Sequence, residues 1–339
     1  MAARPLLAVL SLLLLPLANA QTNPSRGDVR LVVLSDFNGA YGSTRYPRAV
    51  AKAISDIVQL WKPDLFVSAG DVVAGQSGAL PPERFAMMWS AFDREVAAPL
   101  RKAGIPYALA IGNHDGSSLR TPDGGYLFAR ERRAAAAYWR QPMYAENLAY
   151  QDHQDFPFHY SFLFHGLFFV VIDASSAQLG EAQTAWLETQ LARPAAQAAA
   201  LRIVVGHLPL YAVSGDKNKP GEVLAQGDAL RRLLERYDVD LYVSGHHAAY
   251  YLGHKGELDM LFSGGIGARR LLGSDASPRS TVTLADIFLS TREIRFTTFD
   301  AFTGERIALD SLPARVSGFS GTIVRRDLAE ASPLADVRP

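Results

Sequence analysis

The chain has 339 residues, of which 48% are hydrophobic, and its 34 lysines and arginines balance 34 aspartates and glutamates. This hydrophobic fraction supports a sizeable core and excludes a disordered or collagen-like chain. A net charge of zero argues against a broad nucleic-acid surface, which needs surplus basic side chains to displace counterions from phosphates. The chain has no cysteine. Disulfides, catalytic thiols and thiolate metal ligands are therefore excluded, and any metal must be held by nitrogen and oxygen atoms.

Residues 1–20 have the features of a signal peptide. Arg4 precedes an apolar run over residues 6–15, and Ala18-Asn19-Ala20 forms a small-residue cleavage site. The run is shorter than the roughly 20 residues that a membrane-spanning helix needs. We therefore expect a secreted or periplasmic protein with no stable membrane span after cleavage, and the alternative is an uncleaved anchor. Residues 21–28 are then a linker.

From residue 29 onward, short apolar runs alternate with segments of helical periodicity, which is typical of an α/β protein. Because a helical crossover joins the first two strands, these strands are expected to be parallel. The first third of the mature chain thus reads as a βαβαβ unit, with strands over residues 29–34, 64–68 and 106–111 and helices over residues 45–61 and 81–103.

Residues 116–158 are turn-rich and then aromatic and polar, without clean strand periodicity, and we interpret them as a lid-like insertion over one end of the sheet. Residues 313–339 read as a C-terminal tail in which residues 316–324 form a further strand or a docking segment. The elements predicted between these two segments are helices over residues 180–192 and 228–237, and strands over residues 159–164, 167–172, 202–205, 239–244, 250–252, 258–262, 281–289 and 294–299. The last four of these strands are expected to complete a second sheet.

Five predicted strands run into a residue that is able to bind a metal ion. Because ligands bind beyond the carboxyl ends of strands in α/β sheets, residues at these ends are expected to converge. Carboxylates, a carboxamide and imidazoles suit divalent ions such as Mn, Fe and Zn. For any single residue, a helix cap, a turn or a core histidine is the alternative. The five positions are Asp36, Asp71, Asn113 (followed by His114), His207 and His246.

These motifs resemble those of the calcineurin-like metallophosphoesterases, which run D-x-H, GD, GNH(D/E), H and GH-x-H. Here they read Ser35-Asp36-Phe37-Asn38, Gly70-Asp71, Gly112-Asn113-His114-Asp115, Gly206-His207 and Gly245-His246. The resemblance implies a four-layer αββα sandwich over residues 29–312, with a metal site at the carboxyl ends of the strands. It also implies a hydrolase that acts on phosphoester bonds by metal-activated water.

Residue by residue, the resemblance implies two metal positions. Asp71 would bridge two divalent ions, and Asn113, His207 and His246 would complete one of the two sites. Asp36 belongs to the other site. The identity of the ions, among Mn, Fe, Zn, Mg and Ca, stays open.

The resemblance further implies that His114, positioned by Asp115, protonates the leaving oxygen or stabilises charge on the transferring group. Tyr41 is expected to line the pocket, so that Tyr41, Asn113 and His114 are the candidate substrate contacts. Lys217 and Lys219 in the loop over residues 214–221, together with several loop arginines (Arg45, Arg84, Arg120, Arg269 and Arg270), are further candidates for phosphate contacts. For each of these basic residues, a solvated surface charge is the alternative.

Two positions depart from the family pattern, and both affect the site built on Asp36. Asn38 stands where the first motif has histidine, and Ala248 stands where the last motif has its second histidine. Asn38 either coordinates through its side-chain oxygen, which would favour Mg, Mn or Ca, or fills a left-handed turn before Gly39. His247 is a further candidate ligand, although adjacent residues of a strand point to opposite faces. Ala74 stands where purple acid phosphatases have their iron-binding tyrosine, so a purple Fe(III) enzyme is not expected.

The sequence therefore predicts an exported metal-dependent phosphoesterase whose partner is a small-molecule or exposed phosphomonoester or phosphodiester. The alternative from another class is a catalytically weakened or inactive single-metal binding protein of the same fold. A third possibility is that the strand-end residues only cap helices.

Overall fold

The computed structural model of the protein describes residues 23–145 and 148–329. The predicted signal peptide over residues 1–20 lies outside the described residues. Within the described ranges, no helix combines the length and the apolar composition that crossing a membrane requires.

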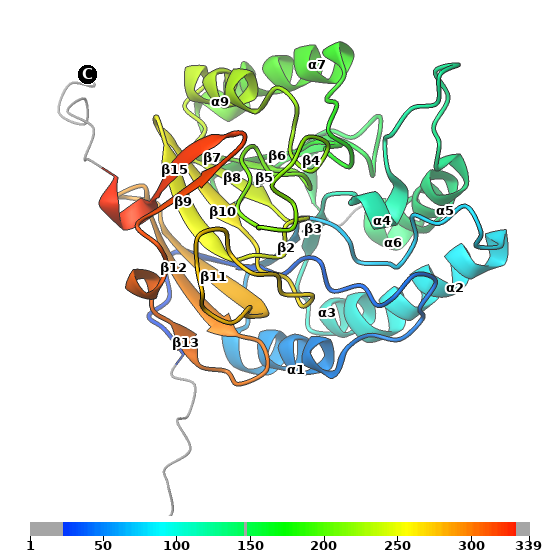
Figure 1. Ribbon diagram of the computed structural model, residues 1–339, viewed down its shortest axis with the longest axis horizontal. Coiled ribbons are helices and arrows are strands. Elements are labelled where there is room, and N and C mark those ends of the chain that lie inside the picture. The colour runs from blue at the N-terminus through cyan, green and yellow to red at the C-terminus, as the bar shows by residue number, and fades with distance from the viewer. Residues whose placement is uncertain (1–22, 146–147, 330–339) are drawn as a thin grey trace, which may run out of the picture.

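Two β-sheets pack face to face between two layers of helices, which gives the expected four-layer αββα sandwich (Figure 1). The six-stranded sheet has the order β13-β12-β11-β1-β2-β3, and the nine-stranded sheet has the order β14-β15-β9-β10-β8-β7-β6-β5-β4. Helices α1, α2 and α3 cover the first sheet, and α7 and α9 cover the second (Figure 1).

The strands of the first sheet are β1 (Val29–Val33), β2 (Leu65–Ser68), β3 (Tyr107–Leu109), β11 (Thr281–Phe288), β12 (Glu293–Asp300) and β13 (Arg306–Ile307). Those of the second are β4 (Ala149–Asp152), β5 (Tyr160–Phe164), β6 (Leu167–Val171), β7 (Leu201–Val205), β8 (Leu241–Ser244), β9 (Tyr251–Lys255), β10 (Leu258–Phe262), β14 (Arg315–Gly318) and β15 (Gly321–Arg325). The helices are α1 (Arg48–Asp56), α2 (Pro82–Phe92), α3 (Ala98–Lys102), α4 (Asn113–Gly116), α5 (Ala129–Trp139), α6 (Pro142–Ala145), α7 (Glu181–Leu191), α8 (Pro194–Gln197) and α9 (Gly227–Arg236).

The central strand β1 is buried along its whole length, as its run of apolar residues, interrupted by Arg30, predicts. It pairs in parallel with β2, as expected, and antiparallel with β11. Arg30 is the polar exception in this strand, and its guanidinium forms a buried ion pair of 2.8 Å with Asp286, its direct cross-strand partner on β11. A buried charge of this kind is tolerated because it is paired and hydrogen-bonded.

Helix α1 buries Ala49, Val50, Ala53 and Ile54, which recur at helical spacing and form the apolar face that the sequence predicts. The helix continues as a wider π-type turn over Ile57–Trp61 and stops at a left-handed residue just before Pro63. After this turn the chain enters β2. Because β2 is parallel to β1, the carboxyl ends of the two strands lie side by side.

The structure corrects one assignment of strands to sheets. Strands β11 and β12 were expected in the second sheet, but they join the first, where β11 lies beside β1. Each of the two sheets has an edge that is able to pair with a further apolar strand. Side-chain alternation along that strand does not distinguish one sheet from the other. Residues 313–329 contribute β14 and β15, and β15 pairs with β9, so the second sheet extends beyond the predicted domain limit at residue 312.

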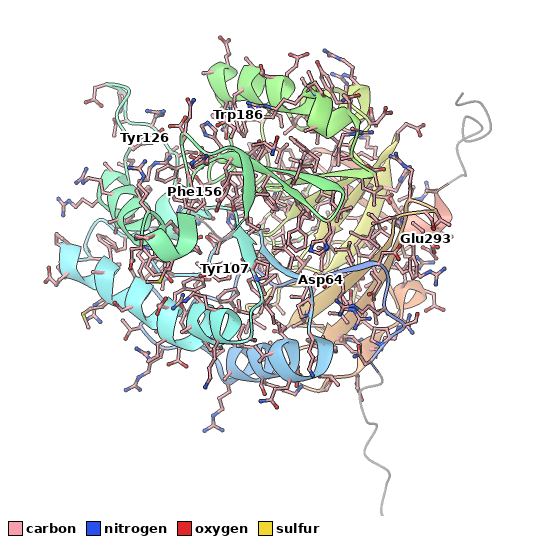
Figure 2. All side chains as sticks on the ribbon, turned by 180° about the vertical axis from the view of Figure 1, so that it is seen from behind. Asp64, Tyr107, Tyr126, Phe156, Trp186 and Glu293 are labelled. Atoms are coloured by element: carbon pink, nitrogen blue, oxygen red, sulfur yellow. The ribbon has the colours of Figure 1, made fainter. Side chains whose placement is uncertain are left out.

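The insertion over residues 116–158 contains an unpredicted helix, α5, which packs its inner face against the core. Tyr138 and Trp139 of α5 are buried, and the Trp139 ring lies 5.8 Å from Tyr107 and 6.4 Å from Phe156. Tyr107 and Phe156, both labelled in Figure 2, are themselves buried. These aromatic side chains therefore fill the core.

Candidate metal centre

The predicted strand-end residues lie at the carboxyl ends of strands from both sheets. Asp36 and Asp71 follow β1 and β2, and Asn113 begins α4 just after β3. His207 follows β7 and His246 follows β8 on the second sheet. Because the two sheets are stacked, their strand ends open onto the same edge of the sandwich.

Four of these side chains converge on one point. Asn113 Oδ1 lies 2.8 Å from both His207 Nε2 and His246 Nδ1. Asp71 Oδ2 lies 3.3 Å from His207 Nε2, and one potential ligand atom each of Asp71, His207 and His246 lies within 4.8 Å of the others. All four residues are buried. This is a compact set of nitrogen and oxygen donors, as a divalent transition metal ion requires.

His207, His246 and Asn113 each form a hydrogen bond through the side-chain atom that faces away from the centre. The other polar atom of each side chain, which would bind the metal, is therefore directed at the centre. His207 Nδ1 donates to the Ala69 carbonyl at 2.7 Å, and His246 Nε2 donates to Glu222 Oε2 at 2.7 Å. Asn113 Nδ2 donates to Gln76 Oε1 at 2.6 Å, which turns Oδ1 inward. Partners of this kind are typical of metal-binding residues, since they fix ring tautomers and amide orientation. The side chains therefore fit a bound divalent ion.

The backbone at the centre is held in an unusual conformation. Asp36, Asp71 and His246 have φ angles of 50°, 56° and 61°, in the left-handed region that non-glycine residues rarely adopt. Each such residue costs about 1–3 kcal/mol, and this strain is found at functional sites where the surroundings enforce it. These three are predicted metal ligands, and Gln76 and Ala248 beside them have left-handed φ angles of 64° and 43° as well.

The charge on these residues depends on their neighbours. Burial alone would lower the pKa of His207, but the carboxylates of Asp71 and Asp36 outweigh it and raise that pKa to about 9. Burial lowers the pKa of His246 to about 3, although its bond to Glu222 opposes this. At neutral pH and without a metal ion, His207 is therefore expected to be an imidazolium and His246 a neutral imidazole.

Asp36 lies next to this group but is not part of the cluster of Asp71, His207 and His246. Burial raises its pKa to about 6, while Ser35 Oγ donates to Asp36 Oδ2 at 2.7 Å. Gly245 makes room for this carboxylate, because a Cβ at Gly245 would lie 2.3 Å from Asp36 Oδ2. The glycine before His246 is thus needed for close packing between the two sheets.

The two departures from the family pattern have different surroundings. Asn38 is half-buried, its φ angle is not in the left-handed region, and its N–H donates to the Asp71 carbonyl at 3.2 Å. Of the two alternatives for Asn38, the left-handed turn is therefore excluded, and the left-handed residue of this motif is Asp36. Ala248 is buried, and its carbonyl accepts the Arg269 N–H at 2.7 Å.

His247 is fully buried and contacts a loop over residues 213–222. Its Nδ1 accepts the N–H groups of Val213 and Ser214 at 3.1 and 3.2 Å, and its Nε2 donates to the Glu222 carbonyl at 2.9 Å. Both ring nitrogens are thus occupied by this loop. His247 holds the loop that carries Lys217 and Glu222 to the centre.

Asp115 contacts a different partner from the one expected. Its carboxylate accepts four backbone N–H groups, those of Asp71, Val72, Val73 and Gly112, at 2.8–2.9 Å. The His114 ring instead bonds through Nδ1 to the Gly75 carbonyl at 3.1 Å. The expectation that Asp115 orients the His114 ring is therefore corrected: Asp115 joins the loops after β2 and β3.

His114 and Tyr41 lie together at the rim of the centre. Their ring centroids are 5.2 Å apart, and Tyr41 is exposed. The His114 N–H donates to Asp71 Oδ1 at 2.8 Å, which links this residue directly to the metal-binding group. Both residues are available to a substrate that approaches from solvent.

Three contacts at the centre were not predicted as such. Gln76 orients Asn113, and Glu222 bonds His246. Lys217, predicted only as a phosphate contact, places Nζ 3.0 Å from His246 Nε2. No family motif includes Gln76 or Glu222, and the one available signal was that polar residues follow Asp71 and His207 in loops.

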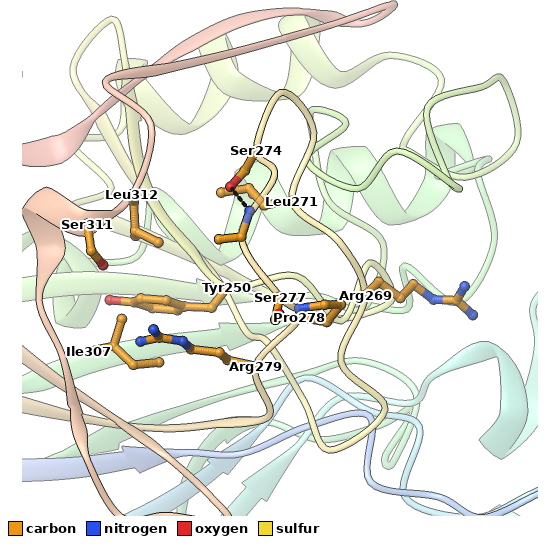
Figure 3. A pocket seen from close by; sticks show the side chains of 11 residues that line it. Tyr250, Arg269, Leu271, Ser274, Ser277, Pro278, Arg279, Ile307, Ser311 and Leu312 are labelled. Atoms are coloured by element: carbon orange, nitrogen blue, oxygen red, sulfur yellow. Dashed lines mark hydrogen bonds between the residues drawn. The ribbon is translucent and has the colours of Figure 1, made fainter.

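Two of the loop arginines make side-chain contacts with other groups than the predicted ligands. Arg120 packs on the Tyr126 ring at 3.7 Å and donates to the Gly124 carbonyl. Arg269 lines a cavity of about 250 Å³ beside Tyr250 and Arg279 (Figure 3). This cavity lies between the loop over residues 269–279 and residues 307–312, and no predicted metal ligand lines it.

Comparison with known proteins agrees with this geometry. The calcineurin-like phosphoesterase family matches residues 29–250, which is more than half of the chain. None of the curated proteins matches the chain.

Solved structures share the fold at low sequence identity. The purple acid phosphatase PPD1 of yellow lupin (Lupinus luteus) has a TM-score of 0.55 and 17% identity, and the match covers 84% of this chain and 54% of the lupin chain. GAP50, the anchor in the inner membrane complex of Plasmodium, has a TM-score of 0.51 and 17% identity, with 83% and 87% coverage. A dimetal phosphatase from Danio rerio has a TM-score of 0.50 and 14% identity, with 80% and 95% coverage. With the family match over residues 29–250 and the converging ligand set, the chain belongs to the calcineurin-like phosphoesterase family of metal-dependent hydrolases.

Proposed function

We propose that this protein is an exported enzyme that hydrolyses a phosphomonoester or phosphodiester with a divalent metal ion and a water nucleophile. One observation carries the proposal: Asn113 Oδ1 lies 2.8 Å from a nitrogen of His207 and of His246, beside Asp71. When bound there, a divalent ion supplies Lewis-acid polarisation of the phosphoryl group and lowers the pKa of water. A nucleophilic serine or cysteine is not needed.

The residues around this position divide the remaining work. Asp71, Asn113, His207 and His246 would hold the ion, and Asp115 keeps the loop of Asp71 in place through its four N–H bonds. His114 donates Nδ1–H to the Gly75 carbonyl, which leaves Nε2 on the substrate side; with a proton on both ring nitrogens, His114 would give the Nε2 proton to the leaving oxygen.

The number of ions is a finer part of the proposal. The family pattern implies two, and the second would be bound by Asp36 and Asn38 together with the bridging Asp71. Because Asn38 and Ala248 replace both imidazoles, this second position would offer only oxygen ligands, which favour Mg, Mn or Ca over Zn. The second ion is therefore expected to bind more weakly than the first.

Reconstitution of the mature chain tests the catalytic proposal. The protein from Gln21 onward would be stripped with a chelator and loaded with Mn, Mg, Ca, Fe or Zn. It would then be assayed with p-nitrophenyl phosphate and bis-p-nitrophenyl phosphate. We expect metal-dependent turnover that Asp71→Ala abolishes and that Asp123→Ala, in an exposed turn, leaves unchanged. Stoichiometric metal binding without turnover under any condition would instead favour the single-metal binding protein.

Export is proposed from the sequence of residues 1–20 alone. When the full chain is expressed with a C-terminal tag, the protein is expected in the periplasm or the medium. Its mass should be that of a chain whose first residue is Gln21. Replacing Ala18 and Ala20 with arginine removes the small residues of the cleavage site and should leave the precursor uncleaved. An untruncated protein in the cytosol of wild-type cells would contradict export. We propose that the binding partner is a small-molecule or exposed phosphoester. We propose no broad nucleic-acid surface, because the net charge is zero.

A further inference from the structure

A lysine from a loop of the second sheet lies inside the candidate metal centre. Lys217 belongs to the connection between β7 and α9, and its Nζ lies 3.0 Å from His246 Nε2 and 3.3 Å from Nδ1. Its side chain is 15% exposed, whereas that of Lys219, two residues later, is 63% exposed. Lys217 thus differs from an ordinary solvated surface lysine.

Contacts at three points, the two ends and the middle, hold this loop in place. His247 binds the two ends of the loop, at Val213, Ser214 and Glu222. Asn218 Oδ1 accepts the Phe319 N–H at 2.8 Å, which ties the middle of the loop to the turn between β14 and β15. The position of Lys217 is therefore set by the fold and not by a flexible side chain alone.

Glu222 directs the ammonium group toward the centre. Its Oε2 lies 3.1 Å from Lys217 Nζ and accepts the His246 Nε2–H at 2.7 Å. One carboxylate thus holds both a metal ligand and a cation. An ammonium beside a cationic metal site is unfavourable unless anionic groups lie close to both, and Glu222 supplies one such charge while a bound phosphate would supply more.

The chain also lacks two imidazoles that the family pattern has in the neighbouring site, the one built on Asp36. Asn38 and Ala248 stand in place of two histidines, so positive charge from a second ion is expected to be held less firmly there. We propose that Lys217 is a substrate-binding residue whose ammonium donates to a non-bridging oxygen of the phosphate group. This inference rests on the proposed function, since it assumes that a phosphate group binds at the metal centre.

A purely structural role for Lys217 makes different predictions. If the lysine served only to neutralise Glu222, its removal would disturb His246, and metal affinity and thermal stability would fall together. If it binds phosphate, removal leaves the metal ligands in place and weakens only the binding of the anion. The two roles therefore separate in the ratio of metal affinity to phosphate affinity.

The test uses the mature protein loaded with Mn²⁺, with inorganic phosphate as the probe. Calorimetry would give the Mn²⁺ stoichiometry and affinity, and then the phosphate affinity, for wild type, Lys217→Ala, Lys217→Arg and the control Lys102→Ala, an exposed lysine at the end of α3. We expect Lys217→Ala to keep its Mn²⁺ affinity within about threefold and to lose about 10- to 100-fold in phosphate affinity, the range of one charge-assisted hydrogen bond. Lys217→Arg should restore most of this loss, and Lys102→Ala should match wild type.

Two results would overturn the proposal. One is unchanged phosphate affinity in Lys217→Ala, and the other is a parallel loss of Mn²⁺ and phosphate affinity that Lys217→Arg does not restore. Where substrate turnover is found, KM of Lys217→Ala should rise more than kcat falls. If wild type shows no turnover at all, the proposed function fails, but the phosphate measurements still decide the role of Lys217.

Discussion

Asn113 shows how a single side chain at the centre depends on a residue outside every motif. Its amide is able to present either oxygen or nitrogen to a metal ion, and only oxygen is a ligand. The bond from Nδ2 to Gln76 Oε1 selects the productive orientation. The backbone of Gln76 is held in place because its main-chain N–H donates to the buried Glu131 carboxylate at 2.8 Å.

We expect Gln76→Ala to lower metal affinity by about 10-fold or more, the usual effect of removing a partner that orients a metal ligand. The fold should remain, since the substitution does not remove core packing. Mn²⁺ titration of the variant measures this, with Gln154→Ala in an exposed turn as control. Equal Mn²⁺ affinity in the two variants would contradict an orienting role for Gln76.

His207 makes metal binding depend on pH. The pKa of its imidazole is raised to about 9 in the absence of metal, chiefly by Asp71 and Asp36 acting against burial. A metal ligand must be neutral, so the ion has to displace a proton below that pH. Mn²⁺ affinity is therefore expected to rise from about pH 6 toward pH 9, by about tenfold per unit where one proton is displaced. Calorimetry in buffers of different ionisation enthalpy should detect about one released proton at pH 7, and a pH-independent affinity would show that His207 is already neutral.

At the scale of elements, helix α5 shows why one helix was not predicted. Its buried face includes Glu131 and Arg132 besides Ala135, Tyr138 and Trp139. Charged residues on a buried face hide the apolar periodicity from which helices are predicted. The partners that make their burial possible are distant in sequence, for example Asp173 for Arg132.

The Arg132–Asp173 pair joins the insertion to the end of β6. The two side chains are 6% and 7% exposed and form an ion pair of 2.8 Å. Arg132→Ala leaves Asp173 buried without its charge partner, and we expect a loss of about 3–5 kcal/mol in the free energy of unfolding. Denaturant unfolding measures this, with the exposed Arg133→Ala on the same helix as control. The double variant Arg132→Met, Asp173→Leu should recover part of the loss, and a loss below about 1 kcal/mol for Arg132→Ala, as for an exposed pair, would contradict this account.

At the scale of the whole molecule, the metal centre is shared between the two sheets. Asp71 and Asn113 come from the first sheet, and His207 and His246 come from the second. The bond from His207 Nδ1 to the Ala69 carbonyl crosses between the sheets even without an ion. An ion held by all four residues would add a further link between the halves of the sandwich.

Metal binding is therefore expected to stabilise the whole domain. An ion that binds only the folded state adds about 2.7 kcal/mol at a free concentration about 100 times its Kd, which corresponds to a rise of several degrees in Tm. Thermal unfolding with Mn²⁺ and with chelator measures the shift. In Asp71→Ala the shift should be lost or greatly reduced, and an equal shift in this variant would place the ion elsewhere.

The sequence by itself determined the features that depend on residues close together in the chain. Apolar runs and helical periodicity predict the βαβαβ unit, and the motif dipeptides at the strand ends indicate both the family and the positions of Asp36, Asp71, Asn113, His207 and His246. Only the tertiary structure decided which sheet β11 and β12 join, which partner Asp115 binds, and that His247 anchors a loop. It also brought Gln76, Lys217 and Glu222 to the centre. These contacts join residues far apart in the chain through loops whose paths depend on packing, and no local pattern of residue types encodes such paths.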